Sequence, residues 1–289
     1  MLTSRVREWS ESGAREQVGG HELFVHRRPG DGPAMLWLHG FPSSSYDWRG
    51  LLEAHPEGDV LSFDFLGFGL SDKPADHVYT LAWQADAAEE LVLRSGAEQV
   101  FVVAHDMGTS VATELMAREL EGRARIRIGG ALLFNGSILL DRASPTLGQK
   151  LLRSPLGPVF ARLSTERSFR LQFGQIFSDE HPLTREEADD QWALMAHLGG
   201  ARIAHRTIHY MDERERFTER WHGAVRDWPG SLSLAWALGD PVATVAVLDG
   251  LRELRPGVPV QELPGIGHYP QIERPDLIAA ALDEALARA

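Results

Sequence analysis

Short apolar runs alternate with longer amphipathic stretches along most of the chain. Several runs are apolar at almost every position, as in Met35-Leu-Trp-Leu38 and Val100-Phe-Val-Val-Ala104. Such runs are typical of strands covered on both faces, so the pattern predicts an α/β fold with a mostly parallel central sheet flanked by helices. The expected strands are His21–Arg27, Met35–His39, Val60–Asp64, Val100–Ala104, Ile126–Phe134, Leu232–Leu238 and Val258–Glu262, and the expected helices are Leu81–Ser95, Thr109–Leu120, Val245–Arg255 and Pro275–Ala287.

The pattern changes between residues 136 and 228. This stretch has helical periodicity, is interrupted by several prolines and contains no convincing strand. A connection of this length is too long for an ordinary crossover between strands. We therefore predict one α/β core made of residues 1–135 and 229–289. A helical cap of residues 136–228 is inserted over the strand ends, where open α/β sheets bind their ligands.

The composition limits the chemistry that the chain can perform. It has 289 residues, of which 43% are hydrophobic, and no cysteine. This size allows a large core without disulfides or structural metals. The absence of cysteine excludes thiol nucleophiles and thiolate metal sites. A nucleophile in this chain must therefore carry oxygen or nitrogen.

Charge and hydropathy favour a soluble protein. The formal net charge of −12 opposes binding to nucleic acid, which depends on clustered basic residues. Residues 1–17 contain no apolar run of the kind found in a signal peptide or membrane anchor. No later window approaches the roughly 18 apolar residues of a spanning helix. We expect a cytoplasmic protein with neither a nucleic-acid nor a membrane partner.

A buried strand runs directly into a helix at Val102-Val-Ala-His-Asp106-Met-Gly-Thr-Ser110. The small residues around Asp106 match the nucleophile elbow, a sharp strand-to-helix turn that pushes one side chain into the site. The N-terminus of the following helix favours developing negative charge. Asp106 is therefore the candidate nucleophile, with a helix N-cap as its alternative role.

Asp240 and His268 follow in the chain order nucleophile, acid, histidine that such an elbow predicts. Each comes directly after an expected strand, so the fold would bring both side chains to Asp106. A turn aspartate and an ordinary loop histidine are the alternatives. The backbone N–H groups of Phe41 and Met107 are candidates for an oxyanion hole.

Four motifs give the chain a resemblance to a known family. They are His39-Gly-Phe-Pro-Ser-Ser-Ser-Tyr-Asp-Trp48, Asp64-Phe-Leu-Gly-Phe-Gly-Leu-Ser-Asp-Lys-Pro74, His105-Asp-Met-Gly108 and His268-Tyr-Pro-Gln271. The chain resembles the α/β-hydrolase superfamily, in the branch of epoxide hydrolases and haloalkane dehalogenases that use an aspartate nucleophile. Within that branch it is similar to the mesoderm-specific transcript proteins and their bacterial relatives. The resemblance covers residues 20–285, including the cap segment Tyr210–Val225, and implies the α/β-hydrolase fold with its catalytic positions.

An aspartate nucleophile suits displacement at a saturated carbon. Attack there forms an ordinary alkyl ester of Asp106, whereas attack on a carboxylic ester would form a reactive anhydride. His268, oriented by Asp240, would then activate water to hydrolyse the alkyl ester. We expect hydrolysis of a small apolar epoxide or of a carbon–halogen bond, without a metal or an organic cofactor.

The leaving group separates these two reactions. A halide needs N–H donors, and dehalogenases of this type usually place Trp after the nucleophile, where this chain has Met107. Epoxide hydrolases commonly present two cap tyrosines, of which the cap contains one, Tyr210. Asn135 and Trp192 are further candidate donors, although a packing role for Tyr210 and an ordinary turn or His268-orienting role for Asn135 stay open. These features favour the epoxide, with a haloalkane dehalogenase as the alternative.

Other positions are interpreted as surroundings of the site. The charge run Asp212–Arg216 and Arg220 are expected to form a solvated helix face. Asp64 is expected to orient the loop after its strand. A cofactor-free oxygenase and a non-catalytic ligand-binding protein are rival functions on the same fold. An apolar pocket is expected from Phe41, Trp48, Met107, Phe134, Ile138 and Trp192, with the cap histidines His197, His205 and His209 at the surface or in the core.

Overall fold

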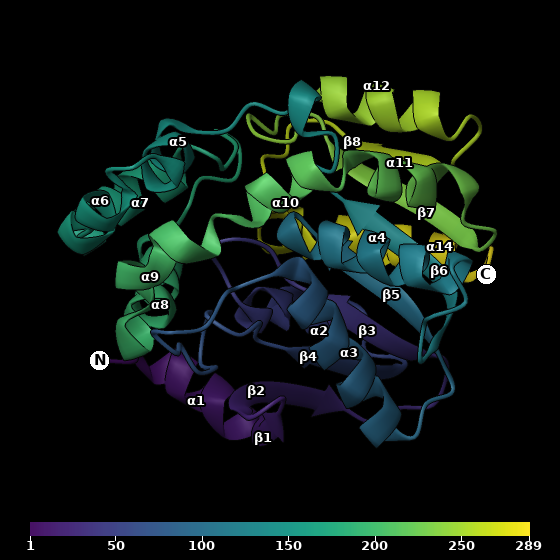
Figure 1. Cartoon of the computed structure of the whole chain (residues 1–289), viewed down its shortest axis with the longest axis horizontal. Helices are drawn as coiled ribbons and strands as arrows, with labels where there is room; N and C mark the ends of the chain where they lie inside the picture. The colour runs from purple at the N-terminus through teal and green to yellow at the C-terminus, as the bar shows by residue number, and fades with distance from the viewer.

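The computed structural model describes residues 1–289 and has an eight-stranded sheet at its centre (Figure 1). The strands lie in the order β1-β2-β4-β3-β5-β6-β7-β8. The pairs β1–β2 and β2–β4 are antiparallel, and all other pairs are parallel. The strands are β1 (Ala14–Val18), β2 (His21–Arg28), β3 (Ala34–Leu38), β4 (Asp59–Phe63), β5 (Gln99–His105), β6 (Arg127–Phe134), β7 (Ser231–Ala237) and β8 (Val260–Leu263).

Helices cover both faces of the sheet because successive strand residues point to opposite sides. Leu36 and Val102 belong to the apolar cluster that includes α3 and α4, whereas Trp37 and Val103 belong to the cluster that includes α2 and α14. None of the helices combines the length and the apolar composition needed to cross a lipid bilayer. The helices are α1 (Ser4–Ser12), α2 (Arg49–Ala54), α3 (Leu81–Ser95), α4 (Met107–Leu120), α5 (Leu147–Arg153), α6 (Gly157–Leu163), α7 (Glu166–Gly174), α8 (Arg185–Ala196), α9 (Gly200–Thr207), α10 (Tyr210–Arg216), α11 (Thr218–Asp227), α12 (Val245–Leu254), α13 (Pro270–Glu273) and α14 (Pro275–Leu286).

The expected strands and helices are all present, with ends shifted by a residue or two. Strand β1 is not predicted by the hydrophobic pattern, because four of its five residues are exposed or only half-buried. It lies at the edge of the sheet and pairs with β2 alone. An edge strand with little apolar cover leaves no apolar run in the sequence.

The segment between β6 and β7 contains helices α5 to α11 and no strand. Helices α5 to α9 stand to one side of the sheet, whereas α11 returns to pack on α4 (Figure 1). At that contact the Trp221 indole donates to the buried carboxylate of Glu114, which also pairs with Arg118 and Arg220. The last helix of the segment is therefore part of the layer that covers the sheet.

Helix α1 ties the start of the chain to this segment. The carboxylate of Asp190 in α8 accepts hydrogen bonds from the Thr3 hydroxyl, the Arg5 guanidinium and the Tyr46 hydroxyl. Asp190 is buried, so these three donors compensate a carboxylate that has lost its water. The contact fixes α8 against the rest of the molecule.

Candidate active site

Asp106 occupies the sharp turn between β5 and α4. Its backbone has φ 43° and ψ −110°, a strained conformation for a residue with a Cβ, and such strain concentrates at functional sites. Gly108 allows the turn, because a Cβ there would lie 2.2 Å from the Leu38 carbonyl oxygen. The strand, the turn and the helix together hold the Asp106 side chain at the carboxyl edge of the sheet.

Replacing Gly108 with Ala is expected to destabilise the fold by about 1–3 kcal/mol, because the new methyl group would overlap a main-chain oxygen that cannot move alone. The midpoint of thermal unfolding, followed by circular dichroism, measures this. Gly223→Ala is the matched control, because a Cβ at this helical position meets nothing closer than the end of Arg226 at 3.7 Å. Equal melting temperatures for the two variants would contradict the close approach at Gly108.

The two carboxylate oxygens of Asp106 have different surroundings. Oδ2 accepts a hydrogen bond from the Phe41 backbone N–H at 2.9 Å. Met107, whose N–H is the other expected donor, begins α4 but forms no hydrogen bond with this carboxylate. Oδ1 lies 3.7 Å from a guanidinium nitrogen of Arg214, beyond hydrogen-bond distance. One oxygen is therefore held by the backbone while the other stays free of a hydrogen bond.

His268 and Asp240 form a buried pair. The Nδ1 atom of His268 lies 2.7 Å from Oδ2 of Asp240, whose Oδ1 accepts from the backbone N–H groups of Val242 and Ala243 at 2.7 and 3.0 Å. Burial alone would lower the pKa of His268, but the charge of Asp240 and their hydrogen bond outweigh it and raise that pKa. Burial alone would raise the pKa of Asp240, but His268 and the other donors lower it. Asp240 therefore stays charged and fixes the imidazole ring.

Asn135 holds Asp240 from the other side. Its side-chain nitrogen donates to Oδ2 of Asp240 at 2.8 Å and to the Ala237 carbonyl at 3.2 Å, and its oxygen accepts from the Ala237 N–H at 3.0 Å. Both amide hydrogens are thus engaged. The arrangement favours an orienting role for Asn135 over donation to a leaving group.

Four neighbouring parallel strands each deliver one of these side chains. Because the carboxyl ends of parallel strands meet at one edge of the sheet, residues far apart in sequence converge there. The charge of Asp106 also raises the pKa of His268, which reflects their proximity. Asp106 follows β5, Asn135 follows β6, Asp240 follows β7 and His268 follows β8.

Comparisons with known proteins identify the family of the chain. The model of the alpha/beta hydrolase family matches residues 35–281. LipZ of Mycobacterium tuberculosis, a protein named as a hydrolase, is 52% identical over 97% of this chain and 98% of its own length. The chain belongs to the alpha/beta hydrolase family. The mesoderm-specific transcript protein of Mus musculus is 32% identical to this hydrolase over 95% of the chain and 85% of its own length, so the resemblance seen in the motifs is confirmed.

Solved structures share the fold of this alpha/beta hydrolase. The haloalkane dehalogenase DatA from Agrobacterium tumefaciens C58 superposes with a TM-score of 0.79 at 22% identity, covering 96% of each chain. The epoxide hydrolase CorEH superposes with a TM-score of 0.76 at 18% identity, covering 95% of this chain and 98% of its own. These likenesses concern the architecture alone.

The prediction that the charge run Asp212–Arg216 is solvated is wrong at Arg214. Its side chain is 1% exposed, and its Nε donates to the Ser110 hydroxyl at 2.8 Å while another guanidinium nitrogen donates to the Asp106 backbone carbonyl at 3.1 Å. The physical reason is that α10 and α11 fold back over α4, which buries one face of the polar helix α10. Tyr210, Met211 and Arg214 are spaced so that they share this face. The aromatic side chain of Tyr210 is the sequence signal that could have indicated a buried face.

Tyr210 lies in the same buried layer as Arg214. The Arg214 guanidinium is 4.6 Å from the centre of the tyrosine ring, and the Phe41 ring is 5.6 Å from it. Burial, and after it the charge of Asp106, raises the pKa of Tyr210 well above its usual value. The phenol therefore remains protonated and can act as a hydrogen-bond donor.

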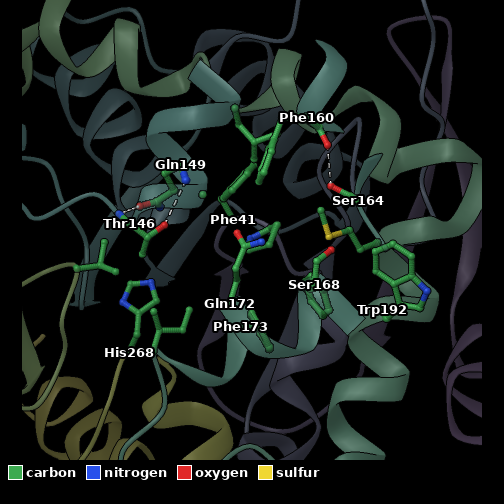
Figure 2. A pocket seen from close by; sticks show the side chains of 17 residues that line it. Phe41, Thr146, Gln149, Phe160, Ser164, Ser168, Gln172, Phe173, Trp192 and His268 are labelled. Carbon is green, nitrogen blue, oxygen red and sulfur yellow. Dashed lines mark hydrogen bonds between the residues drawn. The ribbon is translucent and has the colours of Figure 1, made fainter. Parts of the chain in front are cut away.

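A cavity of about 90 Å³ in this hydrolase lies between the core and helices α5 to α8 (Figure 2). His268 is at one end of it and Trp192 at the other, so Trp192 is not beside the proposed nucleophile. Asp106, Tyr210 and Asn135 are buried but do not line it. Its apolar lining residues are Phe41, Pro42, Leu152, Phe160, Phe169, Phe173, Ile176, Trp192, Met195 and Val242.

The expected pocket residues are only partly correct. Phe41 and Trp192 line the cavity. Trp48 and Phe134 instead belong to the apolar cluster on the face of the sheet that α2 and α14 cover. Met107 and Ile138 are buried in the cluster on the other face. None of the histidines His197, His205 and His209 lines the cavity.

Proposed function

We propose that this alpha/beta hydrolase cleaves a small apolar epoxide through an ester of Asp106. The observation that carries the proposal is the unequal treatment of the Asp106 carboxylate. Oδ2 is held by the Phe41 N–H, while Oδ1 has no hydrogen bond and is free to attack. The His268–Asp240 pair at the same edge of the sheet supplies the base that a second, hydrolytic step requires.

In the first step Oδ1 of Asp106 attacks a ring carbon, and the bond between that carbon and the epoxide oxygen breaks. The oxygen takes a proton from the Tyr210 phenol, which leaves a hydroxyl beside the new ester. His268 then removes a proton from water, and the oxygen of that water attacks the ester carbonyl. The resulting oxyanion is the former Oδ2, held by the Phe41 N–H with the helix N-terminus at Met107 behind it. Collapse expels the alkoxide and leaves Asp106 as a carboxylic acid carrying the second proton of the water. That proton passes to the alkoxide, which gives the diol and restores the Asp106 carboxylate, and the proton on His268 returns to Tyr210.

A haloalkane is the second candidate substrate, supported by the guanidinium of Arg214 beside Asp106. A halide leaving group needs N–H donors, and a guanidinium has several. Two of its donors already bond the Ser110 hydroxyl and the Asp106 carbonyl, however. Tyr210 carries an O–H group that can protonate an oxygen leaving group, so we place the epoxide first.

Replacing His268 with Ala is expected to trap the ester, because the first step needs no base whereas the second does. Mass spectrometry of the peptide that contains Asp106, after incubation with an epoxide panel, should show an increase equal to the mass of the epoxide. His209→Ala is the matched control, since this histidine is exposed and does not line the cavity. It should turn over normally without accumulating ester.

The same experiment with haloalkanes separates the two candidates. An adduct that lacks the halogen, with halide released into solution, would assign the chain to the dehalogenases. Failure of every epoxide and every haloalkane to modify Asp106 in His268→Ala would refute an ester mechanism altogether.

A further inference from the structure

The outer surface of α5, α6 and α7 is unusually apolar for an exposed surface. Five of the eleven large apolar side chains that are strongly exposed in the chain lie between residues 147 and 171. They are 53% to 72% exposed, and large exposed apolar patches mark surfaces that bind another molecule or a membrane. We call this set the cap patch: Leu147, Leu156, Val159, Leu163 and Leu171.

Helices α5 to α7 form a group that projects from one side of the molecule in Figure 1, away from the sheet. The same helices line the cavity with their inner faces. Leu147 lies between the lining residues Thr146 and Gly148, Leu163 precedes Ser164, and Leu171 precedes Gln172. The cap patch therefore borders the cavity.

Basic residues accompany the cap patch although the chain as a whole has a net charge of −12. Residues 143–171 contain five basic residues and one acidic residue, Glu166. Arg153 pairs with Asp212 and Glu215, and Arg170 pairs with Glu166 and Asp189. Three basic side chains on exposed positions have no acidic partner: Lys150, Arg162 and Arg167.

Helical spacing places these cations beside the exposed leucines. Lys150 is one turn from Leu147 on α5, and Arg167 is one turn from Leu171 on α7. On α6, Arg162 lies next to Leu163 and one turn from Val159. Apolar side chains bordered by free cations match the two components of a lipid surface, an apolar interior and anionic headgroups.

We propose that the cap patch docks on an anionic phospholipid surface and that the cavity behind it receives its apolar substrate from the lipid. This is docking on a surface that needs no spanning helix, and it replaces the expectation that the protein has no membrane partner. A second copy of the chain fits the patch less well, because a two-fold interface would bring the unpaired cations of both copies into one contact with no acidic side chain of the patch to pair with them. The acidic remainder of the molecule would be repelled by the headgroups, which orients the cap toward them.

Sedimentation with lipid vesicles tests the proposal on the full chain, without any assay of turnover. We expect binding to mixed phosphatidylcholine and phosphatidylglycerol vesicles, little binding to pure phosphatidylcholine vesicles, and loss of binding as salt rises. The triple variant Leu147→Ser, Leu163→Ser and Leu171→Ser should bind at least about tenfold more weakly. Each of Lys150→Gln, Arg162→Gln and Arg167→Gln should weaken binding about fivefold.

The control variant Val78→Ser, Leu120→Ser and Arg216→Gln changes exposed residues outside the cap patch and should bind vesicles as the unchanged chain does. The proposal would be overturned if the control variant bound vesicles as weakly as the cap-patch variants do, or if the unchanged chain did not bind the mixed vesicles. Self-association that the cap-patch variant abolishes, in the absence of vesicle binding, would instead identify a second copy as the occupant. Because binding is read without chemistry, a failure here is distinct from a failure of the Asp106 ester mechanism.

Discussion

Replacing Asp240 with Asn is expected to lower kcat by about 10⁴-fold, the size of effect seen when the acid of such a triad becomes an amide. Asp240 accepts hydrogen bonds on both oxygens, from two backbone N–H groups on one side and from Asn135 and His268 on the other. An amide must turn its NH₂ group toward one of these pairs of donors. If the NH₂ group faces His268, it donates a hydrogen bond to Nδ1. Nδ1 must then carry a lone pair, so the ring proton moves to Nε2. The imidazole could then no longer take a proton from water.

Steady-state turnover of an epoxide, together with the mass of the Asp106 peptide, checks this result. The first step does not use His268 as a base, so the ester should accumulate in Asp240→Asn. Asp249→Asn is the matched control, since Asp249 is exposed on α12 and pairs only with Arg252 at 3.7 Å. A kcat near the unchanged value, with no ester observed, would show that Asp240 does not orient the base.

Replacing Arg214 with Leu is expected to slow formation of the Asp106 ester by about 10²–10³-fold, similar to loss of one strong donor from a preorganised site. The guanidinium is the nearest cation to the buried carboxylate and also holds the backbone carbonyl of the nucleophile. Without it the negative charge of Asp106 would be buried without a counter-charge, and the elbow would lose a fixed contact. The effect should fall on kcat more than on KM, because Arg214 does not line the cavity.

The rate at which the adduct appears in a His268→Ala background isolates this first step. Arg214→Lys keeps the positive charge but cannot reproduce both guanidinium hydrogen bonds, to the Ser110 hydroxyl and the Asp106 carbonyl. It should therefore retain part of the rate of ester formation if the charge contributes to that rate. Arg216→Leu on the same helix is the control, because its side chain is exposed and does not contact Asp106. An unchanged adduct rate in a folded Arg214→Leu variant would reduce Arg214 to a packing residue.

The parts of the site that are local in sequence could be predicted from it. The elbow around Asp106 lies within one strand-turn-helix stretch, so its small residues reveal it directly. Asp240 and His268 each follow a strongly apolar strand, and the rule that parallel strands align their carboxyl ends supplies the rest. The local sequence around each residue, together with the alignment of strand carboxyl ends in a parallel sheet, is enough to place these three residues at one edge.

The parts that depend on packing between distant segments could not be predicted. A charged residue on a polar helix is normally solvated, and Arg214 is buried only because its helix lies over Ser110 and the Asp106 carbonyl, about one hundred residues away in the chain. Trp48 and Phe134 look like pocket residues because nothing in their local pattern says which face of the sheet they reach. Which strand face meets which helix is decided by the whole assembly.

Assembly of the site from four neighbouring strands also links activity to folding. Asp106, Asn135, Asp240 and His268 come from strands β5 to β8, and no single hairpin or helix pair contains more than a fragment of the set. A partly folded chain that has lost β7 or β8 keeps the elbow but loses the acid or the base. Loss of activity during unfolding should therefore coincide with cooperative loss of the sheet, and turnover reports on the integrity of the whole core.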